Sequence, residues 1–175
     1  MMAKQRVPLV VLVSGSGSNL QAIIDATSNP DYPAEIVAVI SNIEGVKGLE
    51  RAEKAGIPTA VLDHKNFPDR DSYDFALHEL IDSYHPEIIV LAGFMRILTD
   101  EFVNTYLGKM LNIHPSLLPK YKGLKTHQKA LDAGDERHGA TVHFVTPELD
   151  SGPLNIQAEV PGLATDTSES RAARV

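Results

Sequence analysis

The chain of 175 residues contains no cysteine. This absence excludes disulfides, thiolate nucleophiles, cysteine-ligated zinc and iron–sulfur clusters, so any chemistry must use oxygen and nitrogen groups. The chain also lacks an apolar run as long as a membrane span, the longest being residues 88–95, and it shows no secretory pattern at its N-terminus. We therefore expect a soluble, cytoplasmic protein.

Positive charge is scarce as well. The chain has 16 Lys and Arg residues against 23 Asp and Glu residues, which gives a net charge of −7. Binding to a nucleic-acid backbone needs clustered positive charge, so we expect no nucleic-acid partner. The one basic cluster, Lys120, Lys122 and Lys125, fits either a local anion contact or a solvated loop face. The seven histidines show no HExxH or related spacing, and we expect no metal.

Apolar runs alternate with helical patterns along the first two-thirds of the chain. Strands are predicted at residues 7–13, 35–40, 59–62, 88–92 and 110–114, with helices between them. This alternation indicates right-handed crossovers and a parallel sheet covered on both faces. Two further strands, at 140–145 and 154–160, have too short a connection for a helical crossover and should be antiparallel. We predict a single α/β domain over residues 1–175 with a mixed sheet, and we expect the polar segment 162–170 to be mobile.

A glycine-rich turn of sequence SGSGSN, residues 14–19, links the first strand to the first helix. Backbone amides in such a turn form an anion site together with the helix N-terminus. The turn lacks the lysine of the nucleoside-triphosphate loop, and Leu20 stands where the dinucleotide fingerprint has its third glycine. Ser41 and Asn42 also replace the acidic residue that would bind an NAD ribose. The pattern disfavours ATP and NAD and favours a phosphate monoester, although a tight turn without a ligand fits the same spacing.

Asn112 and His114 lie two residues apart at the end of an apolar run and are followed by Pro115. Alternate residues of a strand share a face, so the amide and the imidazole point the same way. Asp150 lies in a turn at the end of an adjacent predicted strand, where it can orient His114 and favour its charged form. This set suits acyl transfer to an amine, because the amide stabilises an oxyanion and the ring carries protons. A buried structural histidine and a turn-capping aspartate fit the same pattern.

Four ordered motifs carry a resemblance to a known family: residues 14–23, residues 91–98, residues 111–120, and HFV at 143–145 leading to LDSGP at 149–153. Through them the chain resembles the phosphoribosylglycinamide formyltransferases, folate-dependent transformylases of purine synthesis, along nearly its whole length. The resemblance implies a three-layer α/β/α fold with a seven-stranded, mostly parallel sheet of order 3-2-1-4-5-6-7, in which strand 6 is antiparallel. That order predicts a ligand crevice between the first and fourth strands.

The resemblance also implies binding residues for two small molecules. The phosphate of glycinamide ribonucleotide would be bound by Gly17, Ser18 and Asn19. The co-substrate 10-formyltetrahydrofolate would be bound by Arg70, Met95, Arg96, Ile97, Leu98 and Asn112.

The same resemblance makes Asn112, His114 and Asp150 the catalytic trio of a direct formyl transfer. Asn112 would hold the formyl oxygen, and His114 would act as acid and electrostatic stabiliser. Asp150 would favour the charged ring and help to relay protons through water. A cis peptide is expected before Pro119.

The chain departs from the family pattern at several points. Ser16 stands where Asn is common, Lys125 where a second histidine is frequent, and Arg171 where an apolar helix residue is usual. Relatives continue beyond the position of Val175 into a further helix, whose acidic residue holds the substrate ribose. We therefore expect a formyltransferase domain that lacks this C-terminal helix and binds its substrate weakly.

Related chemistries leave alternatives open. Formyltetrahydrofolate hydrolase and methionyl-tRNA formyltransferase share the Asn-x-His pair and the distant Asp, so the trio does not identify the acceptor. The glycine turn favours a phosphorylated acceptor, and we expect neither the regulatory module of the hydrolase nor the barrel domain of the tRNA enzyme. A folate- or phosphate-binding module with little activity is the other alternative. Both a monomer and a homodimer are compatible with the sequence.

Overall fold

The computed structural model describes residues 4–175, and the strands within this range form a seven-stranded sheet of order β3-β2-β1-β4-β5-β6-β7. The predicted fold class, a mostly parallel sheet of this order flanked by helices, is confirmed. The chain divides into two compact units, the first ending at Met110 and the second spanning Leu111–Val175.

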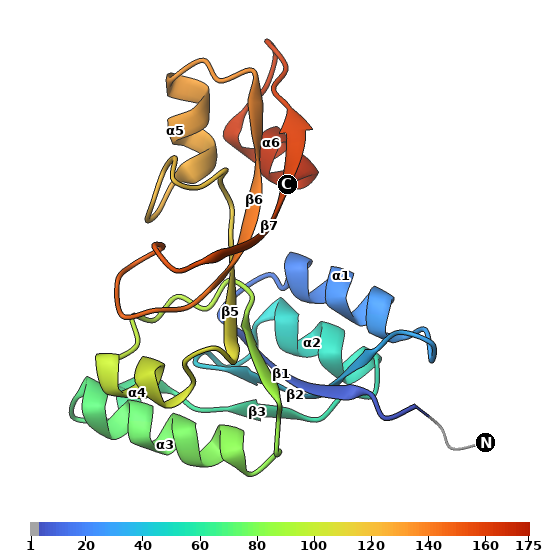
Figure 1. Cartoon of the computed structure of the whole chain (residues 1–175), viewed down its shortest axis with the longest axis vertical. Coiled ribbons are helices and arrows are strands. Elements are labelled where there is room, and N and C mark those ends of the chain that lie inside the picture. Colours follow the sequence, from blue (N-terminus) through green and yellow to red (C-terminus); the bar gives the residue numbers. More distant parts are fainter. Residues whose placement is uncertain (1–3) are drawn as a thin grey trace. The chain divides into compact units, whose positions relative to one another are not determined.

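The first unit is an alternation of strands and helices, as the apolar pattern predicted. In chain order it contains β1 (Val7–Val13), α1 (Ser18–Thr27), β2 (Ala34–Ser41), α2 (Lys47–Lys54), β3 (Thr59–Val61), a 3-10 turn (His64–Asn66), α3 (Arg70–Asp82), β4 (Ile88–Leu91) and α4 (Asp100–Thr105). Strand β1 pairs in parallel with both β2 and β4, and β2 pairs in parallel with β3. Figure 1 shows α1 and α2 along one face of these strands and α3 along the other.

The core of this unit follows from two periodicities. Strand β1 is a continuous apolar run because a central parallel strand is covered on both faces, and its last four residues are fully buried. Helix α3 instead buries a single stripe formed by Tyr73, Leu77 and Ile81. Its start is set by Asp69, whose side chain accepts a 2.7 Å hydrogen bond from the amide of Ser72.

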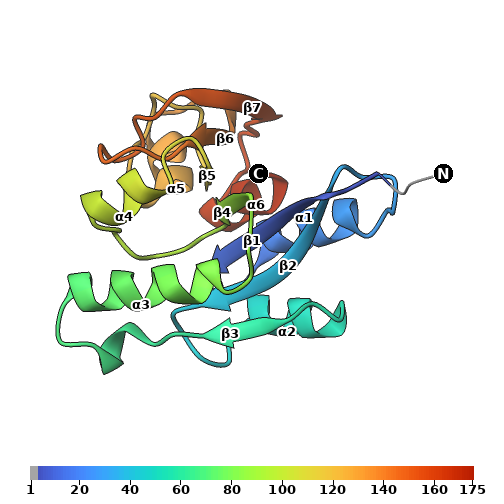
Figure 2. The same cartoon turned by 60° about the horizontal axis from the view of Figure 1, so that its bottom comes forward.

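The second unit is an antiparallel sheet with two helices. It contains β5 (Met110–His114, beginning at the last residue of the first unit), α5 (Thr126–Asp132), β6 (Arg137–Phe144), β7 (Leu154–Pro161) and α6 (Ser168–Arg174). Strand β6 pairs antiparallel with β5 and with β7, which confirms the prediction from the short connection. Figure 2 shows β6 and β7 side by side.

Helix α6 was not predicted, and its first residues overlap the end of the polar segment 162–170. It begins in a capping box in which Thr167 and Ser170 bond each other's backbone amides through their hydroxyls. Arg171, only 4% exposed, lies 3.1 Å from a carboxylate oxygen of Asp166 and donates a 2.9 Å hydrogen bond to the carbonyl of Asp135. A charge at this usually apolar position is tolerated because it is paired.

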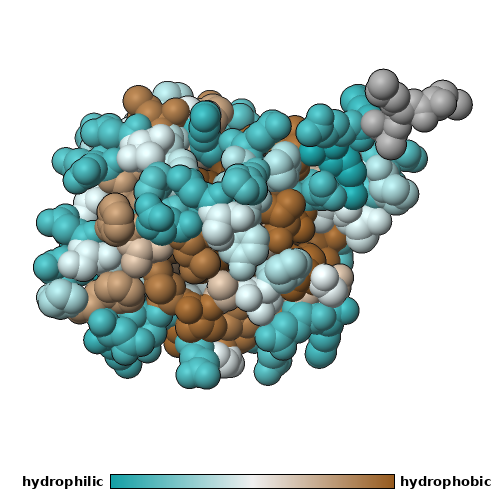
Figure 3. Space-filling view, turned by 90° about the horizontal axis from the view of Figure 1, so that it is seen from below, coloured by the Kyte–Doolittle hydropathy of each residue, from teal (hydrophilic) through white to brown (hydrophobic). Residues whose placement is uncertain are grey.

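The surface mixes polar and apolar residues. On the face seen in Figure 3, apolar residues lie between charged and polar ones, and the exposed large apolar side chains of the first unit include Val61 and Phe75. Within residues 4–175, none of the helices has the length and apolar character needed to cross a membrane.

Candidate active site

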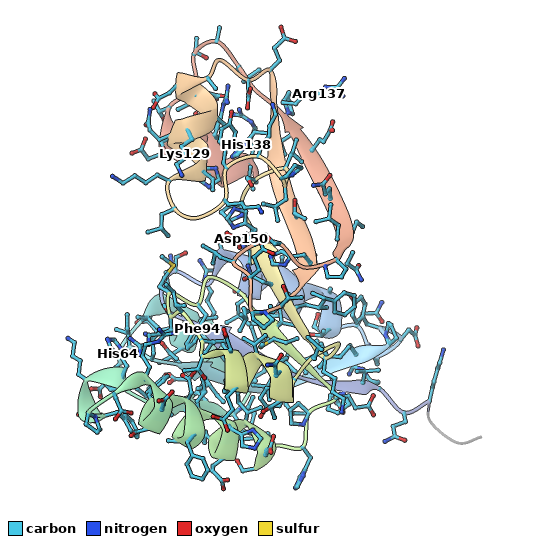
Figure 4. The ribbon with its side chains drawn as sticks, turned by 60° about the vertical axis from the view of Figure 1, so that its left-hand side comes forward. His64, Phe94, Lys129, Arg137, His138 and Asp150 are labelled. Atoms are coloured by element: carbon cyan, nitrogen blue, oxygen red, sulfur yellow. The ribbon has the colours of Figure 1, made fainter. Side chains whose placement is uncertain are left out.

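The three side chains of the predicted catalytic trio lie close together in the second unit. Asn112 and His114 are on β5, and Asp150 is in the turn between β6 and β7 (Figure 4). The Nδ1 atom of His114 is 3.5 Å from Oδ1 of Asp150, and both side chains are only 6% exposed. An imidazole and a carboxylate therefore face each other in a nearly buried position, beside the amide of Asn112.

Asp150 reaches this position through an unusual backbone conformation. Its φ of 49° lies in the left-handed region, which non-glycine residues seldom adopt. Its Oδ2 accepts a 2.9 Å hydrogen bond from the amide of Gly123, on a distant segment. Among the described hydrogen bonds, none joins this carboxylate to its own turn, so the turn-capping alternative does not describe the structure.

The ring of His114 has an oxygen acceptor opposite each nitrogen. Its Nε2 donates a 2.8 Å hydrogen bond to the carbonyl of Tyr121, since a carbonyl oxygen can only accept. Its Nδ1 faces the Asp150 carboxylate. Each nitrogen of this ring therefore faces an oxygen that can accept a hydrogen bond.

His143 joins the trio, and the sequence analysis gave it no role. It is the cross-strand partner of Asn112 in the β5–β6 pairing and is 2% exposed. Its Nδ1 donates a 3.0 Å bond to the carbonyl of Phe144, so Nε2 is free to accept one from Nδ2 of Asn112 at 3.2 Å. The same Nε2 is 3.7 Å from Oδ1 of Asp150. His143 therefore orients the side-chain amide of Asn112. This contact follows from the register of β5 against β6 and could not be predicted from either residue alone.

The loop between β5 and α5 contains the remaining features predicted for this unit. The peptide between Leu118 and Pro119 is cis, as expected. Lys125 is exposed and precedes α5 in a left-handed conformation, and Lys122 donates a 2.6 Å hydrogen bond from Nζ to the hydroxyl of Ser151. The basic cluster is therefore a loop face that is largely exposed.

The glycine turn of the first unit has an open helix N-terminus. Gly17 precedes α1 with φ 70°, and a Cβ atom there would lie 2.6 Å from Cα of Gly48. Helix α1 has no side-chain cap and no acidic residue in its first turn, which contains Ser18 and Asn19. The amides of that turn have no partner within the helix and can bind an anion.

The turn is held by neighbouring loops. Arg51 donates a 2.8 Å hydrogen bond from Nε to the carbonyl of Ser16. The hydroxyl of Ser14 donates to the side-chain oxygen of Asn42 at 2.6 Å and accepts from the amide of Met95 at 2.8 Å. The segments that follow β1, β2 and β4 thus meet where the strand order reverses, which is the predicted place for a ligand.

The predicted folate-binding residues other than Asn112 lie in the same unit as the glycine turn. Met95 and Ile97 are 61% and 70% exposed, and Leu98 is half-buried. Arg96 lies over the ring of Tyr73, 5.1 Å from its centroid, and its buried Nε has no hydrogen-bond partner. Exposed Arg70 opens α3 one turn before Tyr73. The predicted site residues therefore form two groups, one in each unit.

Metal-binding geometry is a separate question. Across the part of the chain that the structure describes, no three His, Asp or Glu side chains are grouped so that they could hold a metal ion.

Comparison with known proteins decides the family. A family model described as formyl transferase matches residues 7–175. The chain belongs to the formyl transferase family. Phosphoribosylglycinamide formyltransferase of Escherichia coli (strain K12) is 55% identical over 167 residues, which are 95% of this chain and 79% of that protein. The trifunctional purine biosynthetic protein adenosine-3 of Chironomus tentans is 53% identical over 94% of this chain, which covers 12% of that longer protein.

A solved structure of another formyl transferase is similar throughout. The phosphoribosylglycinamide formyltransferase of Coxiella burnetii has a TM-score of 0.91 and 51% identity, over 98% of this chain and 80% of that one. The resemblance deduced from the four motifs is thus confirmed. Formyl transferases use a folate-derived formyl donor, and this chain is accordingly an enzyme of small-molecule substrates.

Proposed function

We propose that this chain transfers the formyl group of 10-formyltetrahydrofolate to the amine of 5′-phosphoribosylglycinamide, a step in the biosynthesis of purines (IMP). The proposal is supported by the family, by the 55% identity to a phosphoribosylglycinamide formyltransferase and by the motifs of the glycine turn. The single observation that carries it is the nearly buried contact between His114 and Asp150 beside Asn112.

Asn112 stabilises the oxyanion in this proposal. The amine nitrogen attacks the formyl carbon, the new C–N bond forms, and the carbonyl electron pair moves onto oxygen. An amide nitrogen has two N–H donors, and His143 accepts one of them from Asn112. The other is directed at the formyl oxygen, where a donor of this kind contributes about 2.7–4 kcal/mol to transition-state stabilisation.

In this proposal His114 and Asp150 stabilise the developing charge and transfer protons. The separation of 3.5 Å between Nδ1 and the carboxylate exceeds that of a usual N–H···O hydrogen bond, so the N–H of Nδ1 remains available to the oxyanion. As the intermediate collapses, the electron pair on oxygen re-forms the carbonyl and the bond from the formyl carbon to N10 of the folate breaks, while the attacking nitrogen loses a proton and N10 gains one. Asp150 orients the ring and passes protons through water, and the reaction needs no covalent nucleophile.

The glycine turn binds the phosphate of the acceptor in this proposal, through the amides of Gly17, Ser18 and Asn19. The folate is bound by Arg70, by Asn112 and by the segment from Met95 to Leu98, whose exposed apolar side chains suit an aromatic ligand. The proposal also includes a cytoplasmic location, a monomer or homodimer, and no part for nucleic acid or metal.

Two substitutions test the catalytic roles. We expect Asn112→Ala and His114→Ala each to lower turnover at least about 100-fold, because each removes an interaction made in the transition state. Turnover is measured as formyl transfer from 10-formyltetrahydrofolate to glycinamide ribonucleotide, with circular dichroism as the control for folding. Near-normal turnover in both folded variants would exclude these roles.

The identity of the acceptor is tested separately. We expect the dephosphorylated acceptor to react far more slowly, because it cannot use the glycine turn. Equal rates for the two acceptors would contradict the phosphate site. Formate released without an acceptor would indicate a hydrolase, and folate binding without either product would indicate a binding module.

A further inference from the structure

One short segment contacts both members of the His114–Asp150 pair. The carbonyl of Tyr121 accepts the 2.8 Å hydrogen bond from Nε2 of His114, and the amide of Gly123 donates the 2.9 Å bond to Oδ2 of Asp150. These two backbone groups are separated by one residue. A displacement of segment 121–123 would therefore move the acceptor of the imidazole and the donor of the carboxylate together.

The segment does not have a relaxed conformation of its own. Tyr121 has a φ of 58°, in the left-handed region that a residue with a bulky side chain seldom adopts. Gly123 has a φ of 83°, which is open to glycine without strain. The conformation at Tyr121 must therefore be held by contacts outside the segment.

The side chain of Tyr121 supplies such a contact. Its hydroxyl donates a 2.6 Å hydrogen bond to Oδ2 of Asp135, and this bond raises the pKa of Tyr121 and lowers that of Asp135. Asp135 is itself fixed between α5 and β6, because its amide donates to the carbonyl of Ala130 at 3.0 Å and its carbonyl accepts from Arg171 at 2.9 Å.

Other attachments of this loop are made by neighbouring residues. Lys120 places Nζ 3.4 Å from Oδ1 of Asp135, but its side chain is 59% exposed. Lys122 bonds Ser151 at the surface, and the hydroxyl of Ser116 donates to the carbonyl of Lys120 at 2.6 Å. The hydroxyl of Ser116 also lies 3.4 Å from the carbonyl of Tyr121, whereas the hydroxyl of Tyr121 is the attachment made by the side chain of the residue that carries the acceptor of His114.

We propose that Asp135 is a positioning residue for formyl transfer. Asp135 fixes segment 121–123 through the hydroxyl of Tyr121. That segment in turn fixes the ring of His114 and the carboxylate of Asp150 relative to each other. Asp135 touches no reacting atom. The inference rests on the proposed function, because it assigns Asp135 to the pair that acts in that reaction.

Tyr121→Phe and Asp135→Ala are the test, because the first removes a single oxygen atom and the second its acceptor. We expect each to lower kcat on the order of tenfold, equivalent to about 1.4 kcal/mol in the barrier, with the KM of both substrates changed less than twofold. The double variant should be no slower than the slower single variant, since both changes break one bond. Lys120→Gln is the matched control, because it removes the other partner of Asp135 and leaves the tyrosine bond. We expect its kcat within twofold of the original.

A second readout does not depend on activity. In the original protein the Nε2 proton of His114 should give a slowly exchanging NMR signal, and in Tyr121→Phe this signal should broaden or vanish while thermal unfolding stays cooperative. A purely structural role would lower the midpoint of unfolding and leave kcat of the folded fraction unchanged. That result would overturn the proposal.

Comparison with His114→Ala separates this inference from the proposed function. If His114→Ala is inactive while Tyr121→Phe and Asp135→Ala keep kcat within twofold of the original, Asp135 does not position the pair. If His114→Ala itself retains full turnover, the proposed function fails and the proposal falls with it.

Discussion

Acid should destabilise this protein through one buried histidine. His138, on β6 beside α5 (Figure 4), is 1% exposed, and its Nε2 is 2.9 Å from Nδ1 of His127. Burial is the main cause that lowers the pKa of His138 to about 4, and the charges of His127 and Arg171 lower it further, whereas Asp135 opposes them. Burial also lowers the pKa of His127. Neither ring accepts a second proton readily in the folded chain.

The sign of the effect follows from the pKa of the two states. In the unfolded chain His138 has its ordinary pKa of 6.5 and binds a proton below that pH, while the folded chain resists protonation down to about pH 4. The stability that the neutral ring contributes is therefore complete above about pH 6.5 and is lost as the pH falls toward 4. A shift of this size corresponds to at most about 3.4 kcal/mol, and we expect about 1–2 kcal/mol because the surroundings relax around the charged ring.

Urea unfolding at pH 7.5 and pH 5 measures this effect. The loss of unfolding free energy between these pH values should be about 1–2 kcal/mol larger for the original protein than for His138→Gln, whose side chain does not titrate. His85→Gln removes an exposed histidine and should leave the pH dependence as it is. An equal loss in the original protein and in His138→Gln would show that this ring is not the acid-sensitive group.

Two further predictions concern the two groups of site residues. Gly17→Ala places a Cβ atom 2.6 Å from the backbone of Gly48 at a φ of 70°, so we expect a loss of about 1–2 kcal/mol in stability. We also expect the KM for the phosphorylated acceptor to rise more than the KM for the folate. An unchanged acceptor KM in steady-state kinetics would count against the phosphate site. His143→Ala removes the acceptor that orients Asn112, so we expect kcat to fall on the order of tenfold, and we expect the double variant with Asn112→Ala to be no slower than Asn112→Ala alone. Independent, additive losses would contradict the coupling.

Much of the fold could be predicted because single segments carry its signals. The continuous apolar run of β1 indicates a strand that is buried on both faces, and the spaced apolar stripe of α3 indicates a helix that is buried on one face. Helix α6 escaped prediction because its start uses Ser170 in place of the usual Glu or Gln, and because its buried residue is Arg171. That arginine can be buried only because Asp166 and the carbonyl of Asp135 lie beside it.

The candidate site was predictable to a smaller extent. Period-two alternation placed Asn112 and His114 on one face, and Asp150 was singled out by its turn at the end of an adjacent predicted strand and by the family resemblance. The role of His143 depends on the register of β5 against β6, and no single residue of either strand indicates that register. The acceptor of His114 is the backbone carbonyl of Tyr121, and every residue has such a carbonyl, so composition gives no sign of it.

By itself, then, the sequence determined the order of the strands and of the helices up to α5, the absence of thiol chemistry, and the residue types able to stabilise an oxyanion and carry a proton. The tertiary structure alone decided which of those groups meet. It pairs Asn112 with His143 and places Asp150 in a left-handed turn. It also brings the backbone of segment 121–123 into hydrogen bonds with His114 and Asp150. The reason is physical. Periodicity and capping act over a few residues and leave a local record, whereas strand register and backbone hydrogen bonds join segments far apart in the chain and are selected by the packing of the whole unit.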